Sequence, residues 1–146
     1  MRKTILIFTL LLVGIGCSEN NIEDEYTKEI TFTTIGKGVL YGNGVEGIQE
    51  SSLIILNQET WQNLINQMDT YSIVSDNFTE TTINFETHTI VVAFGEITSD
   101  NSEIEITSIT QSKKGIAISF SINESDIDDG EIIQPYHIVK IPTIEK

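Results

Sequence analysis

The chain has 146 residues, which suffice for one domain of modest size once a targeting segment is set aside. Hydrophobic residues make up 39% and charged residues 21% of the sequence, a balance that favours a packed core over general disorder. The formal net charge of −14 argues against nucleic acid or an anionic bilayer surface as a direct partner, because both would be repelled.

The N-terminal residues have the pattern of a secretory signal. Arg2 and Lys3 form a short positive stretch, and residues 4–15 form an apolar segment. This segment is shorter than the roughly 20 residues that span a bilayer. Small residues then precede Cys17, a pattern that resembles a bacterial lipoprotein box. The resemblance implies that residues 1–16 are a signal peptide and that the new N-terminal cysteine is acylated on its thiol and its amino group.

Cys17 is also the single cysteine of the chain, which excludes an intrachain disulfide and a cysteine-based metal cluster. Residues 17–28 comprise this cysteine and a polar, acidic stretch without periodicity, which we interpret as a tether. Because two or more acyl chains anchor a protein stably, we expect attachment through lipid to the bacterial cell envelope. The outer membrane is the expected location, with the domain at residues 29–146 facing the periplasm or the cell surface.

The first part of this domain predicts two strands separated by turns. Residues 29–35 alternate apolar and polar side chains, as a half-buried strand does. Five glycines between residues 36 and 47 predict a turn-rich region; they lack the spacing of a phosphate-binding loop. Residues 53–56 form an unbroken apolar run, which we interpret as a buried strand.

One amphipathic helix is predicted after this run. Asn57 is a suitable N-cap, because its side-chain oxygen can accept a backbone N–H of the first turn. Trp61, Leu64, Ile65 and Met68 follow at the spacing of one helical face. The helix is therefore expected to cover the sheet, with Trp61 in the core rather than in a sugar-binding site.

The C-terminal half predicts further strands. Residues 89–94 are continuously apolar, as in a strand covered on both faces, and two alternating segments joined at residues 113–115 predict a hairpin. Prolines bracket residues 135–142, which predicts an edge or terminal strand with Lys140 as a charge that blocks aggregation. The sum is a single α+β, mainly β domain with about six or seven largely antiparallel strands and one short helix.

An acidic turn at residues 123–131 suggests calcium. Its arrangement does not fit an EF-hand, because loop position 12 would be Tyr136 rather than glutamate. A looser calcium site and a plain solvated loop both stay open, and no other cofactor is indicated. The candidate ligands are Asp126, Asp128, Asp129 and Glu131.

Several segments in this order resemble the C-terminal domain family of the protease-complex subunit PrcB. They are the glycine-rich lead-in, LIILNQETWQNLI, INFETHTIVVAFGE, a hairpin and the closing QPYHIVKIP, which together cover residues 36–141. Residues 99–103 depart from the Gly-Gly-Tyr turn that the family usually carries. The resemblance implies a non-catalytic domain, often carried on lipoproteins and named for an accessory subunit of a surface protease complex.

Few residues indicate chemistry. Tyr136 and His137, in the closing motif, are candidates for contact with a partner; alternatively, Tyr136 packs and His137 points outward or caps a carbonyl. His88 could pair with Glu86, a type of pair that is usually structural. No serine lies in a nucleophile-elbow setting, so we expect no enzyme activity.

Three hypotheses about function follow. The first is a non-catalytic envelope lipoprotein that binds a partner protein, with a surface protease complex as the implied partner class. The second is a calcium-binding or small-ligand-binding module at residues 123–131. The third is a hydrolase built on His88 or His137. Nucleic acid is not expected as a partner of any of them.

Overall fold

The computed structural model describes residues 27–124 and 128–144. Within these residues the chain forms one mainly β domain, with eight strands in two antiparallel sheets and one α-helix, which confirms the predicted fold class. The strands are β1 (Lys28–Glu29), β2 (Thr33–Leu40), β3 (Ser51–Ile55), β4 (His88–Phe94), β5 (Thr98–Asp100), β6 (Glu103–Ser112), β7 (Gly115–Asn123) and β8 (Asp128–Pro142). The helix is α1 (Gln58–Met68), and Ser75–Asn77 form a short 3₁₀ turn.

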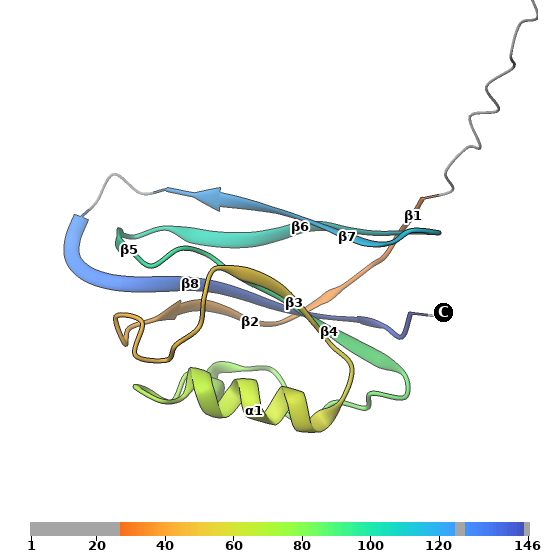
Figure 1. Ribbon diagram of the computed structural model, residues 1–146, viewed down its shortest axis with the longest axis horizontal. Coiled ribbons are helices and arrows are strands. Elements are labelled where there is room, and N and C mark those ends of the chain that lie inside the picture. Colours follow the sequence, from red (N-terminus) through yellow and green to blue (C-terminus); the bar gives the residue numbers. More distant parts are fainter. Residues whose placement is uncertain (1–26, 125–127, 145–146) are drawn as a thin grey trace, which may run out of the picture.

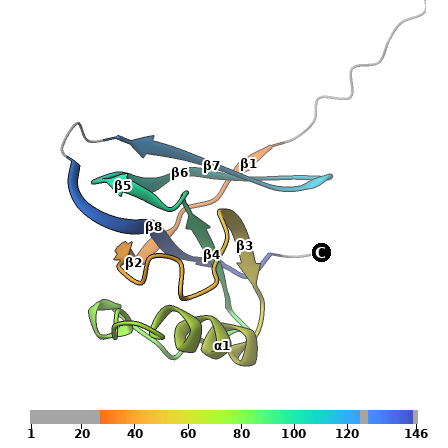
Figure 2. The ribbon, with the colours of Figure 1, turned by 60° about the vertical axis from the view of Figure 1, so that its left-hand side comes forward.

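The elements stack in three layers (Figures 1 and 2). The middle layer is the larger sheet, with the strand order β2-β8-β4-β3 and with β5 paired to β8. Helix α1 covers one face of this sheet, and the smaller sheet, β1-β6-β7, covers the other face. The helix of the described residues is not long and apolar enough to cross a membrane.

Strand β4 is buried on both faces, as its continuous apolar sequence predicts. Ile90, Val92 and Phe94 belong to the core under α1, whereas Val91 and Ala93 belong to the core under the smaller sheet. Successive side chains of a strand point to opposite faces, so one apolar run supplies both cores.

Helix α1 begins and packs as predicted. The Thr60 N–H donates to the Asn57 side-chain oxygen at 2.9 Å, and the four apolar residues of the predicted face are all buried. Trp61 is fully buried and its indole N–H donates to the Thr81 carbonyl at 2.9 Å. Phe78 then stacks on Trp61, with 6.0 Å between ring centroids. The loop after α1 is therefore fixed to the helix and contributes to the same core.

Residues 135–142 belong to the last described strand, β8, but the predicted edge position is wrong, because β8 lies in the middle of the sheet between β2 and β4. The prolines are tolerated because they lie at the limits of the segment that pairs with β4, which runs from Tyr136 to Pro142. The Pro135 carbonyl still accepts the Gly95 N–H at 2.9 Å. Lys140 does not protect an edge; it forms an ion pair with Glu80.

The first predicted strand and the glycine-rich turns also need correction. Residues 29–35 do not form one strand, because the chain passes from β1 in the smaller sheet to β2 in the larger sheet. Strand β2 then continues to Leu40, through two of the glycines assigned to turns. At Gly36 a Cβ atom would lie 2.6 Å from the Phe78 ring, so the absence of a side chain there lets Phe78 pack on the sheet.

The N-cap of α1 gives a test of the fold. Replacing Asn57 with alanine should lower the free energy of unfolding by about 1 kcal/mol, because the Thr60 N–H loses its acceptor. The same substitution at Asn63, exposed within α1, should raise it by a few tenths of a kcal/mol, since alanine has the higher helix propensity. Denaturant unfolding of the two variants measures both changes, and equal effects would contradict the assigned helix start.

Candidate functional site

The larger sheet ends at β3, and no further described strand pairs with its outer edge. Ile55 is buried, but Leu53, Ile54 and Leu56 are 38%, 43% and 59% exposed. The predicted strand is present as β3, but the prediction that residues 53–56 are buried is therefore wrong. The physical reason is that the smaller sheet does not extend over β3: Ile54 is exposed although Val91, its partner on β4, is fully buried.

Strand β7 is the corresponding edge of the smaller sheet. Phe120 and Ile122 pair with the buried residues Ile106 and Ile104 of β6, and paired residues project from the same face of a sheet. Both side chains nevertheless remain 44% exposed. Each sheet thus leaves apolar side chains of its inner face exposed along an edge strand.

A cleft of about 270 Å³ lies where the end of β7 meets the region after β4. We call it the edge cleft. Ile122 and Pro135 supply apolar wall, and three carboxylate side chains line it from separate segments: Glu50, Glu96 and Glu124. No lysine or arginine of the described chain lines it. The edge cleft begins where β3 begins, because Glu50 precedes Ser51 and Ser51 pairs with Phe94, next to Gly95.

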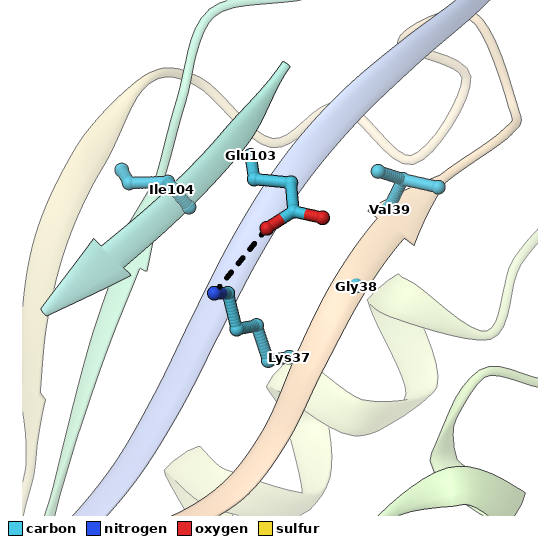
Figure 3. A pocket seen from close by; sticks show the side chains of 5 residues that line it. All are labelled: Lys37, Gly38, Val39, Glu103 and Ile104. Atoms are coloured by element: carbon cyan, nitrogen blue, oxygen red, sulfur yellow. Dashed lines mark ion pairs between the residues drawn. The ribbon is translucent and has the colours of Figure 1, made fainter. Parts of the chain in front are cut away.

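A second cleft, of about 280 Å³, lies between β2 and β6 (Figure 3). There Lys37 projects from β2 toward β6, and its Nζ lies 3.4 Å from Glu103 and 3.6 Å from Glu105. The lysine compensates both carboxylates and bridges the two sheets on this side. These side chains are partly exposed, so the pairs contribute little stability. Among the described residues that line the edge cleft, no cation compensates its carboxylates in this way.

Tyr136, a candidate for contact with a partner, is 3% exposed and packs edge-on against Phe78, with ring centroids 6.1 Å apart. Burial, and secondarily the charge of Asp69, raises the pKa of Tyr136 to about 12. Its position matches the alternative that it packs in the core and does not support contact with a partner.

His137 is 2% exposed, so it too lies away from any partner on the described surface. The prediction that it points outward or caps a carbonyl is wrong. The Ile106 N–H donates to its Nδ1 at 2.8 Å, and its Nε2 lies 3.0 Å from the Thr34 hydroxyl. Because Nδ1 accepts, the neutral ring carries its proton on Nε2 and donates to Thr34. The imidazole thus links β2, β8 and β6 across the two sheets.

The remaining predicted residues do not form a described site. His88 lies 2.8 Å from the Thr87 hydroxyl, and its pairing with Glu86 is absent from the described ion pairs. In the described residues no group of three or more histidine, cysteine or acidic side chains could hold a metal ion. Cys17 and Asp126 lie outside the described residues, as do the side chains of Asp128 and Asp129, and Glu131 is exposed.

Sequence reasoning also missed a buried carboxylate in the glycine-rich loop. Glu46 is 4% exposed, and its Oε1 accepts the Gly42 N–H at 3.0 Å. Its backbone carbonyl accepts from the Gln67 side chain of α1 at 2.9 Å. A Cβ atom at position 42 would lie 2.2 Å from the carboxylate, which explains the glycine there. Glu46 therefore holds the loop against the helix.

A scan of protein-family models and searches of curated proteins and of solved structures returned no match to this chain. The similarity to the PrcB C-terminal domain family stays a prediction that rests on the segments quoted above.

The hydrogen bonds of His137 predict a pH dependence of stability. Burial lowers the pKa of His137 from its usual value of 6.5, Lys37 lowers it further, and Glu105 opposes the shift. The unfolded chain therefore binds the proton more readily than the folded protein. The free energy of unfolding should be highest above about pH 6.5 and should fall as the pH drops from there toward the lowered pKa.

Unfolding measured between about pH 7 and about pH 5.5 tests this dependence, because carboxylates titrate mainly below that range. The His137→Gln variant should lose most of the slope, whatever its absolute stability. A wild-type stability that does not change over this range would contradict the assigned role of the buried ring.

Proposed function

We propose that this chain is a lipid-anchored, non-catalytic protein of the bacterial envelope whose domain binds a partner protein along the β3 edge. The observation that carries this proposal is that β3 has exposed apolar side chains and that no described strand pairs with its outer edge. The lipoprotein-like N-terminus supports the location, and the resemblance to the PrcB family supports a surface protease complex as the partner class.

The sequence of β3 supports a binding role. Soluble proteins usually protect an edge strand with a lysine, a proline or a bulge, because an unprotected edge pairs with other chains. Strand β3, SSLII, has none of these residues, and its register with β4 is regular. Its exposed apolar side chains would therefore be covered when a partner binds. Before a partner binds, the net charge of −14 produces repulsion between copies of the chain and so opposes their association.

The positions of the two histidines support a non-catalytic role. A catalytic base needs a ring nitrogen that can reach the substrate. Both ring nitrogens of His137 are engaged in the interior, with Ile106 and Thr34. His88 has a hydroxyl neighbour, Thr87, but belongs to no described cluster of histidine, cysteine and acidic groups.

The anchor has its own test. The wild-type chain, expressed in a bacterium with a lipoprotein pathway, should lose residues 1–16, gain the mass of its acyl chains and sediment with membranes. The Cys17→Ala variant should lack the acyl mass and leave the membrane fraction, since neither lipid attachment site is formed. Mass spectrometry of the N-terminal peptide measures this; an unmodified Cys17 in the wild-type protein would contradict the anchor.

Partner binding at β3 can be mapped by photo-crosslinking. A photoreactive amino acid at Ile54, on the full-length protein in its native envelope, should give a dominant crosslinked protein. The same group at Gln62, exposed on α1, should not give this product. Adding excess unlabelled protein should suppress the crosslink, as expected of a saturable site. Equal products at both positions would argue against binding at β3.

A further inference from the structure

We propose that the outer edge of β3, with the edge cleft at its start, takes a basic, extended peptide segment of the partner, which adds to β3 as a further strand. This inference rests on the proposed function and names the chemistry of the partner at the same site.

The charge of the edge cleft selects a cationic partner. Glu50, Glu96 and Glu124 line it from three separate segments, and none of the described residues that line it is a cation. In the neighbouring cleft between β2 and β6, Lys37 compensates two carboxylates, so the two clefts differ in charge. Lysine or arginine side chains of a peptide would lie near these glutamates and be attracted to them electrostatically.

The apolar side chains select an alternating peptide. Ile54 of β3 and Phe120 and Ile122 of β7 are each more than 40% exposed on the inner faces of their sheets. An extended peptide presents its side chains alternately to opposite faces. One set would lie on the inner face of the sheet, beside Ile54 and toward Ile122 at the edge cleft, and the other set would lie on the face that α1 covers.

The backbone of β3 supplies the remaining contacts. One edge of β3 pairs with β4 from Ser51↔Phe94 to Ile55↔Ile90, and the other edge has no described strand beside it. A strand added there would form main-chain hydrogen bonds, which give affinity, while the flanking side chains give specificity. Since the edge cleft adjoins Ser51, the carboxylates lie at the end of this edge.

Other occupants fit less well. A nucleic acid and an anionic lipid surface would both be repelled by a chain of net charge −14. A second copy of the chain carries the same net charge of −14, which opposes pairing of two β3 edges. A basic, partly apolar segment can pair with the carboxylates, cover exposed apolar side chains and form hydrogen bonds with the outer edge of β3.

Fluorescence anisotropy of the full-length protein in a nonionic detergent tests the inference. The probe is a labelled peptide of about nine residues in which lysines alternate with valine and isoleucine, long enough to span β3. It should bind saturably, whereas a peptide with glutamate in place of lysine should not. A third peptide, with N-methyl groups on its central residues, should lose binding because it cannot donate the strand hydrogen bonds.

A matched pair of variants locates the site. Glu96→Lys, at the edge cleft after β4, should weaken binding of the basic peptide about fivefold or more. Glu86→Lys makes the same charge change at an exposed residue before β4 and should leave the affinity within about twofold. Absence of saturable binding, equal binding of the N-methylated or acidic peptide, or equal effects of the two variants would overturn the inference.

The outcome is separable from that of the proposed function. A saturable crosslink at Ile54 without binding of the basic peptide would keep the β3 edge as the partner site and overturn only the basic chemistry. Peptide binding without any crosslinked partner would support the chemistry of the site and count against the proposed role in the envelope.

Discussion

The pairing of β8 with strands on both of its sides is the interaction on which the rest of the structure depends. Its 15 residues pair with β5 near the start of the strand and with β2 and β4 along its second half. Because successive side chains alternate, Tyr136 and Ile138 complete the core under α1, and Val139 and Ile141 complete the core under the smaller sheet. Both cores are therefore built on one strand.

This arrangement also determines which edges remain open. With β8 and β4 in the centre, the smaller sheet packs over them and leaves β3 outside its cover. On the β2 side the sheets are linked by the Lys37 ion pairs and, in the interior, by His137. On the β3 side no comparable link is described, and the lining carboxylates and exposed isoleucines remain accessible. The proposed site is thus exposed because the smaller sheet covers β8 and β4 but not β3.

The sequence predicted what depends on local pattern. The cap at Asn57, the buried face of α1 and the doubly covered β4 all follow from spacing within one element, and the structure confirms them. Lateral position in a sheet depends on pairing between distant segments, and it was predicted wrongly for both β3 and β8. An apolar run such as residues 53–56 has the same composition whether a second sheet covers it or not.

The candidate site lay beyond sequence reasoning for the same reason. Glu50, Glu96 and Glu124 are widely separated in the chain and belong to no motif, so only the fold brings them to one cleft. His137 stood out in the closing motif, but its buried role depends on the Ile106 amide of β6, opposite in the sandwich. The exposed apolar residues of β3 could have been noticed as an unprotected edge, had the strand order been known.

Native-state hydrogen exchange, resolved at single amides by NMR, tests the central claim that β3 is an open edge. Amides of β4 and β8 should exchange slowly, through global unfolding, as should those of β3 that bond to β4. The outward amides of β3 should exchange faster by roughly a thousandfold or more, because only water satisfies them. Uniformly slow exchange along β3 in the isolated protein would mean that this edge is already covered and would contradict the account.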